Sequence, residues 1–331
     1  MQRRNFFKSI AATGLGAALS PVIKSAPVYT ADSVKPKTNI TEAMAVPRTT
    51  LSMPGKYPGR VVKVNNANAV VDGKPSEEAA YEMLKRCMLE LTGEHDLSKA
   101  WLQFVGPEDV IGIKVNPVAG KLLTTSHAVT RSIVKQLEEA GIHRSNMIIW
   151  DRREMQLHET GYTEDNYPGI KIKGTECQDA QGGFINKEGK FYSEDRIDKK
   201  CYFLADVEGE DDAYTMPDMV DGGKNSYFTK ICTEDVTKII NVPVLKNAGS
   251  AVTLCLKNLA FGAITNTGRL HQQLWHETCA YACAFSPLRD KVVLNIVDGL
   301  IGCFDGGPSA NPQFMCNYNT LLVGSDRPHR S

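Results

Sequence analysis

The segment DVIGIKVNP, residues 109–117, decides the fold class of this chain of 331 residues. Its residues 110–113 and 115 are apolar and mostly β-branched, as is typical of a strand buried on both faces. A helical pattern follows, with Ser126 in the N-cap position and apolar residues at helical spacing. The segment MIIWD, residues 147–151, is then a second buried strand. This strand–helix–strand order predicts parallel strands joined by a crossover helix.

The same alternation extends over most of the chain. RVVKVNN (60–66) predicts a strand, and a helix from Ser76 to Gly93 follows it. Further strands of the parallel pattern are expected at 237–246, 292–302 and 320–326, and further helices at 251–261 and around 271–285. The polar, glycine-rich residues 152–226 are expected to form an inserted lobe. We therefore predict an α/β fold with a mainly parallel sheet and crossover helices.

The N-terminus has the layout of a twin-arginine export signal. Arg3 and Arg4 precede a weakly apolar stretch from Ile10 to Ile23. We expect a signal in residues 1–30, a linker in 31–58 and a single α/β domain in 59–326. The partner would be the twin-arginine export machinery. The location would be periplasmic or otherwise extracytoplasmic, with a membrane tether if the signal is not cleaved.

Composition restricts the function. The 38 basic and 38 acidic residues balance to a formal net charge of zero, which argues against a general nucleic-acid binder. The body of the chain contains no apolar run of the length a spanning helix needs, so no transmembrane span is expected in the mature protein. The nine cysteines are scattered and form no CxxC pair, so most are expected to be small buried hydrophobic residues.

Polar, chemically capable residues lie at the ends of the apolar strands, among them Lys114, Asp151, Lys246 and Asp298. In open α/β sheets, ligands bind at the carboxyl ends of the strands. Lys114 lies in so apolar a strand that it should reach a pocket or pair with a carboxylate, either Asp151 or Asp298. A buried lysine can also have a lowered pKa and act as a base or form a Schiff base.

Residues 243–264, PVLKNAGSAVTLCLKNLAFGAI, contain two Lys-Asn pairs. A helix over 251–261 would place Gly249–Ser250 at its start, where free N–H groups favour an anion. The predicted ligand is therefore a small anion. Its expected binding residues are Asn116, Lys246, Asn247, Ser250, Lys257 and Asn258, and the catalytic candidates are Lys114, His271 and Asp298. The alternative is a capped helix with solvated lysines.

The segment around 271–285 supports a second hypothesis. On a helix, His276, Cys279 and Cys283 share one face, as zinc or iron ligands could. Small buried cysteines fit that pattern equally well. Three functions therefore stay open: a protein that binds and perhaps transforms a small anion, a metal or redox protein, and a non-catalytic solute-binding protein. The residues specify no cofactor.

Together these segments resemble the family called domain of unknown function 362. Five segments carry the resemblance in the family's order: Val110–Asn116, Ile239–Lys246, Thr253–Gly262, Arg269–His271 and Asp298–Pro308. The resemblance covers roughly residues 60–326 and implies an α/β domain of undefined activity. Some members carry an attached iron–sulfur domain, for which this chain shows no segment.

The resemblance also raises a question about the C-terminus. Members are similar to a pattern G.DP.AVD after the last strand, followed by a helix. Here VGSD (323–326) is followed only by RPHRS. A parallel strand without its covering helix would expose apolar surface. We hypothesise that residues 327–331 are an atypical, truncated C-terminus.

Overall fold

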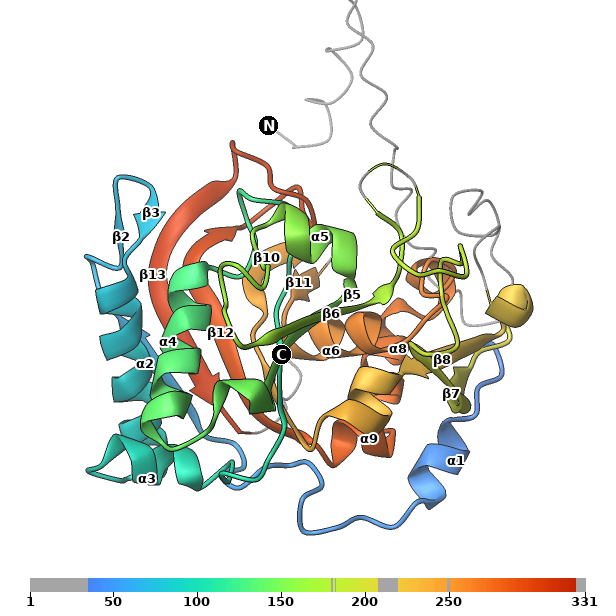
Figure 1. Cartoon of the computed structure of the whole chain (residues 1–331), viewed down its shortest axis with the longest axis horizontal. Helices are drawn as coiled ribbons and strands as arrows, with labels where there is room; N and C mark the ends of the chain where they lie inside the picture. Colours follow the sequence, from blue (N-terminus) through green and yellow to red (C-terminus); the bar gives the residue numbers. More distant parts are fainter. Residues whose placement is uncertain (1–34, 180, 182, 208–219, 249–250, 326–331) are drawn as a thin grey trace, which may run out of the picture.

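A nine-stranded central sheet runs through the computed structural model, which describes residues 35–179, 181, 183–207, 220–248 and 251–325 (Figure 1). Its strands are β1 (Val61–Asn65), β4 (Ile111–Lys114), β5 (Met147–Arg153), β6 (Lys171–Glu176), β9 (Lys238–Asn241), β10 (Val244–Ala248), β11 (Ala251–Thr253), β12 (Val292–Cys303) and β13 (Met315–Gly324). The sheet order is β1-β13-β12-β9-β4-β5-β6, and β10 pairs with both β12 and β11. The expected α/β fold with a mostly parallel sheet is confirmed.

The parallel part of the sheet contains β12, β9, β4, β5 and β6, and β10 is also parallel to β12. The other edge is antiparallel, because β13 runs against both β12 and β1. The expectation that the last strand belongs to the parallel pattern was therefore wrong. Residues 304–314 connect β12 to β13 without a helix, and such a connection suits an antiparallel pair rather than a parallel one.

Helices cover both faces of the sheet (Figure 1). On one face lie α2 (Glu77–Thr92), α3 (Leu97–Leu102) and α4 (His127–Glu139); on the other lie α6 (Cys255–Ala263), α8 (Trp275–Ala282) and α9 (Ser286–Arg289). The strands alternate between these two cores. Ile149 packs with α2 and α4, whereas its neighbour Trp150 packs with α6 and α8. Both faces are thus buried, as a parallel sheet requires.

Two predicted helices have the expected ends. The Ser76 hydroxyl accepts a hydrogen bond from the Ala79 N–H at the start of α2, and Gly93 ends that helix at a φ of +75°. Ser126 caps α4 by accepting from the Val129 N–H. These side chains satisfy backbone groups that the helix itself leaves without partners.

Two other predicted helices were wrong in part. Residues 251–253 form β11, which pairs antiparallel with β10 at Lys246↔Thr253, so α6 begins only at Cys255. The segment around 271–285 is divided into α7 (Leu270–Gln273) and α8. Hairpin pairing outweighs helical spacing in the first case, because the backbone of 251–253 finds partners on β10.

The remaining elements lie around the central sheet and its covering helices. They are α1 (Ile40–Ala45), β2 (Val70–Val71), β3 (Lys74–Pro75), α5 (Glu154–Glu159), β7 (Ile197–Leu204), β8 (Asn225–Thr229) and short helical turns at Arg144–Asn146, Val220–Gly223 and Ile231–Asp235. Within the segment expected to be a lobe, β6 belongs to the central sheet and β7 pairs with β8 in a separate one. The predicted signal and the C-terminal hypothesis concern residues 1–30 and 327–331, which lie outside the described residues. No described helix combines the length and the apolar character needed to span a bilayer.

Candidate functional site

A small cavity lies at the carboxyl ends of β4 and β5, beneath α6. Its volume is about 110 Å³. We call it the strand-end cavity, and its lining residues are Lys114, Asn116, Val118, Asp151, Arg152, Arg153, Gln156, Lys246, Thr253, Lys257, Asn258, Phe261, Gly262, His271 and Pro308. Five of these side chains are lysine or arginine, one is histidine, and Asp151 is the acidic one. Lys114, Lys246 and Lys257 therefore line one cavity.

Lys114 is held as half of a buried ion pair. Its ammonium donates hydrogen bonds to Asp151, to the Val115 carbonyl (2.7 Å) and to Asn258 Oδ1 (3.1 Å), and the side chain is only 1% exposed. Burial lowers the pKa of Lys114, and the Asp151 carboxylate opposes that shift. Of the two carboxylates considered from the sequence, Asp151 is the partner. Because all three N–H groups have acceptors, this lysine is poorly placed to act as a nucleophile.

A chain of buried asparagine side chains connects the cations. Asn258 Oδ1 accepts from Lys114 and from Asn116 Nδ2 (2.9 Å). Asn258 Nδ2 donates to Asn241 Oδ1 (2.8 Å), and Asn241 Nδ2 in turn donates to Asn295 Oδ1 (2.7 Å). The carboxamides thereby fix one another's orientation across β4, β9, β12 and α6. A network in which each member is satisfied is rigid, so the polar groups it presents to the cavity are positioned in advance.

Lys246 enters the cavity from β10 and is 2% exposed. Its ammonium donates to Asn116 Oδ1 at 2.9 Å. No carboxylate lies within ion-pair distance of it in the described part of the chain. Burial lowers the pKa of Lys246 to about 8; the Asp151 carboxylate opposes that shift, and the ammonium of Lys257 adds to it. Lys246 is therefore a buried amine without an ion-pair partner of its own among the described residues, because Asp151 is paired with Lys114.

Lys257 projects from α6 into an aromatic environment. Its nitrogen lies 4.3 Å from the Phe261 ring centroid and 4.7 Å from that of Trp275, with His271 Nε2 at 3.1 Å. His271 Nδ1 faces the Thr267 carbonyl at 2.9 Å, so Nδ1 carries the proton and Nε2 accepts from Lys257. Burial lowers the pKa of Lys257 to about 8 and that of His271 to about 3. The imidazole is thus a neutral acceptor rather than a counter-ion.

Arg152 and Arg153, which the sequence analysis did not single out, follow Asp151 at the end of β5. Arg152 Nε lies 2.9 Å from Glu176 Oε1, and Arg153 Nε lies 2.6 Å from Glu176 Oε2. One carboxylate is therefore shared between two guanidinium groups. Arg152 also donates to Oγ1 of Thr267, the residue whose carbonyl contacts His271 Nδ1. The signal that could have found both arginines is the one used for Lys114, a basic residue at the end of a buried strand.

Two polar groups of the lining lack partners in the described part of the chain. They are the Thr253 hydroxyl, on a residue only 4% exposed, and Gln156 Oε1. Buried polar atoms are nearly always hydrogen-bonded in native proteins, so each such exception calls for an explanation. A ligand group in the cavity would supply the missing partner.

Part of the chain matches the model of a known protein family. Residues 198–329 match the family model described as Domain of unknown function (DUF362). Over these residues the resemblance seen in the sequence is confirmed. The DUF362 segment supplies Lys246, Lys257 and His271 to the cavity, whereas Lys114 and Asp151 come from the chain that precedes it.

The other comparisons add little. A crystal structure of a protein from Thermotoga maritima is similar at 10% sequence identity and a TM-score of 0.35; the match covers 74% of this chain and 54% of that one. This chain thus spans about half the length of that protein, and the similarity is too low to support a conclusion about function. No curated protein matches the chain.

Several sequence candidates lie away from the strand-end cavity. Asp298, within β12, is 2% exposed and accepts from the Ser126 N–H (2.6 Å) and the Leu300 N–H (3.0 Å), so its contacts are structural. Asn247 Oδ1 accepts from the Gly307 N–H at 3.2 Å. Ser250 lies outside the described residues.

The proposed metal ligands do not come together. His276 is exposed and stacks on Trp275, while the Cys283 thiol is buried and donates to the Leu256 carbonyl. Among the residues that the structure describes, no three His, Cys, Asp or Glu side chains are arranged to hold a metal ion, and Cys279 belongs to no such group. The division between α7 and α8 does not itself separate the trio, because all three positions lie on or just after α8.

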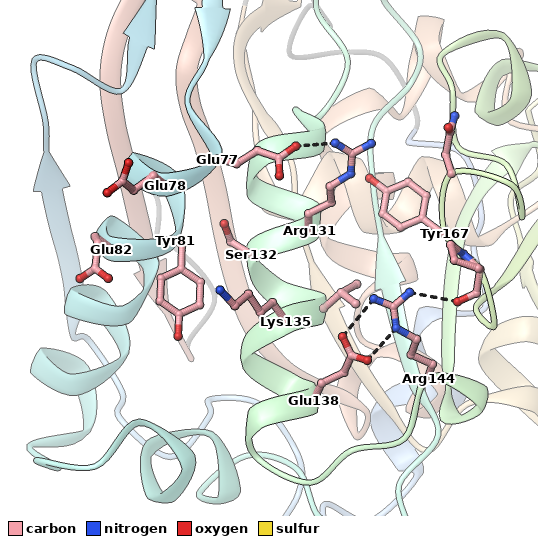
Figure 2. Close-up of a pocket in the computed structure, with 13 residues that line it drawn as sticks. Glu77, Glu78, Tyr81, Glu82, Arg131, Ser132, Lys135, Glu138, Arg144 and Tyr167 are labelled. Carbon is pink, nitrogen blue, oxygen red and sulfur yellow. Dashed lines mark hydrogen bonds and ion pairs between the residues drawn. The ribbon is translucent and has the colours of Figure 1, made fainter.

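A larger hollow of about 720 Å³ lies on the opposite face of the sheet, between α2 and α4 (Figure 2). Two ion pairs lie within its wall: Arg131 with Glu77, and Arg144 with Glu138 at 2.6 Å. Lys135 lies over the Tyr81 ring at 4.6 Å, and Glu78 and Glu82 also line the hollow. The pairs are exposed, and four glutamates face two arginines and one lysine, so this hollow lacks the positive excess of the strand-end cavity.

Proposed function

We propose that the strand-end cavity binds the carboxylate or phosphate group of a small ligand, with Lys246 and Lys257 as its main contacts. The observation that carries this proposal is the presence of two amines in one cavity, Lys246 buried and Lys257 partly buried, neither with a carboxylate within ion-pair distance among the described residues. Burying a charge without a partner raises the free energy of the folded state. Buried charged groups in proteins therefore usually form an ion pair or are neutralised by a shift in pKa. An anionic ligand would supply the counter-charge.

The other charges of the cavity support this assignment. Asp151 compensates Lys114, and Glu176 is shared by Arg152 and Arg153. The lining therefore keeps a positive excess after its internal ion pairs are counted. Excess positive charge in a pocket with low-dielectric walls produces a positive electrostatic potential, which raises the local concentration of anions.

The size of the cavity restricts the ligand. Pockets for drug-sized molecules typically enclose about 300–1,000 Å³. The strand-end cavity, at about 110 Å³, is smaller. It suits a small ion or the anionic end of a longer molecule. The Thr253 hydroxyl, which has no partner among the described residues, would donate to one of its oxygens.

Isothermal titration of the full chain with inorganic phosphate and with acetate tests the proposal. Lys246→Met removes one cation while keeping an unbranched side chain, and Lys63→Met on β1 is the matched control because Lys63 is exposed and lies outside the cavity. A hydrogen bond to a charged group contributes roughly 1.5–3 kcal/mol, so Lys246→Met should weaken anion binding roughly ten- to a hundredfold. The control should bind as the parent does. Equal affinities for the parent and Lys246→Met, or no binding by the parent, would refute the proposal.

A further inference from the structure

Lys257 differs from the other two lysines of the cavity in how its nitrogen is held. Lys114 donates to three oxygen acceptors, one of them a carboxylate. Lys246 donates to a carboxamide oxygen. Lys257 instead lies between two aromatic rings and has one hydrogen-bond partner in the described residues, His271 Nε2. That partner is a neutral acceptor, which can accept a hydrogen bond from an ammonium or from a neutral amine.

We propose that Lys257 forms an imine with a small carbonyl compound that carries a carboxylate or phosphate group. This proposal rests on the proposed function, because Lys246 would hold the anionic group while Lys257 meets the carbonyl carbon. The cavity gives the amine a ligand-facing position, since Lys257, Phe261 and His271 all line it. The anionic group would thereby orient the carbonyl, and such positioning makes the reaction effectively intramolecular.

The state of the amine suits this chemistry. A lysine becomes a nucleophile when burial and neighbouring cations favour its neutral form. Burial lowers the pKa of Lys257 to about 8; Cys279 opposes that shift, and the Arg152 guanidinium adds to it. In the neutral form one N–H can still donate to His271 Nε2, and the nitrogen lone pair is free for attack. The His271 proton is held on Nδ1 by the Thr267 carbonyl, so Nε2 stays an acceptor throughout.

The step is balanced without a redox partner. The nitrogen lone pair attacks the carbonyl carbon, and a proton moves from nitrogen to oxygen to give a carbinolamine. The carbon–oxygen bond then breaks, and the carbonyl oxygen leaves as water with the two amine hydrogens. The neutral imine can take up one proton from solvent to become an iminium ion. That cation would lie against the faces of Phe261 and Trp275, which attract positive charge.

Borohydride trapping tests this inference. The full chain would be incubated with pyruvate, with glycolaldehyde phosphate or with acetone as the uncharged control, reduced with sodium borohydride and analysed by intact-mass and peptide mass spectrometry. We expect one reduced adduct per chain, on Lys257, with at least one of the two anionic carbonyl compounds and none with acetone. Excess inorganic phosphate should reduce the yield. Lys257→Arg, which keeps a cation between the rings but cannot form the imine, should lose the adduct, whereas the surface control Lys63→Met should keep it.

The outcomes separate the two proposals. Phosphate binding without any adduct would overturn the imine and leave the anion site standing. An adduct placed on Lys246, or spread over exposed lysines, would also overturn the assignment to Lys257. Absence of phosphate binding in the titration would remove the anion site and, with it, the basis of this inference. Circular dichroism of Lys257→Arg, matched to the parent, shows that loss of the adduct is not loss of the fold.

Discussion

Gly262→Ala should destabilise the protein although it lies in a helix, where alanine is ordinarily preferred. A Cβ at this position would lie 2.1 Å from Cε and 2.7 Å from Nζ of Lys114, and 3.4 Å from Asp151 Oδ1. The contacted atoms belong to the end of a side chain, which elsewhere could move aside. Here that end is buried and donates to three acceptors. The added methyl group must therefore displace the ammonium from its ion pair.

The expected magnitude follows from two opposing effects. Breaking a buried ion pair costs roughly 3–5 kcal/mol, because a charge is left uncompensated. Replacing glycine by alanine within a helix gains about 1 kcal/mol. The free energy of unfolding of Gly262→Ala should therefore fall by about 2–4 kcal/mol, visible in a urea titration as a lower midpoint with an unchanged slope.

Two companion variants make this prediction sharp. At Gly106 an added Cβ would meet only Asp109 Oδ2, at 3.8 Å, so Gly106→Ala should leave stability unchanged or raise it by up to about 1 kcal/mol. In a Lys114→Ala background the clash is absent, so adding Gly262→Ala should leave the free energy of unfolding unchanged. The reasoning is refuted if Gly262→Ala is as stable as the parent, or if its cost persists without the Lys114 side chain.

Anion binding should depend on the protonation of Lys246 and Lys257, whose pKa values are lowered to about 8. Affinity for sulfate, which keeps its charge in this range, should fall as pH rises through about 8; a flat titration series would contradict the assignment. His271 should make the fold sensitive to acid, because its pKa is lowered from 6.5 to about 3. The unfolded chain takes up a proton that the folded chain excludes, so the stability present above pH 6.5 is lost progressively as pH falls toward about 3. His271→Gln should flatten that part of the urea-midpoint curve, and an unchanged slope would disprove the role. Asp298→Asn should lower stability by about 1–3 kcal/mol, because one backbone N–H loses its acceptor. Its phosphate affinity should equal that of the parent, and weaker binding at full stability would place Asp298 back in the site.

The parallel core could be predicted from sequence because local signals agree there. Ile111–Lys114 and Met147–Arg153 are short apolar strands, and a capped helix lies between them. The antiparallel edge was missed because strand polarity depends on the connection. Residues 304–314 link β12 to β13 with a turn-forming, helix-free segment, and that length already argues for an antiparallel return. Attention to the connection rather than to the strands alone would have given the right polarity.

The site could be predicted only as a set of residue types at strand ends. Lys114, Lys246 and Lys257 do line one cavity, but which carboxylate pairs with Lys114 depends on the strand order, because β5, which carries Asp151, lies directly beside β4. Thr253 was expected in the helix over 251–261, but it lies in β11. It still lines the cavity, because β11 leads directly into α6. Pairing of this kind is a tertiary effect that periodicity within one segment does not encode.

The two Lys-Asn pairs show how the same dipeptide gives different geometry in different secondary structure. In β10 successive side chains alternate between faces, so Lys246 enters the cavity while Asn247 accepts from the Gly307 N–H outside the lining. In α6 successive residues are separated by a smaller rotation, so Lys257 and Asn258 both reach the cavity. Asn258 then fixes Lys114 directly and Lys246 through its neighbouring carboxamide, Asn116, whereas Lys257 is bound to no carboxamide in the described structure. Lys246, oriented by the Asn116 carboxamide, is thus the cation that we propose to hold the anionic group, and Lys257, held by aromatic faces and a neutral imidazole, is the one that we propose to react.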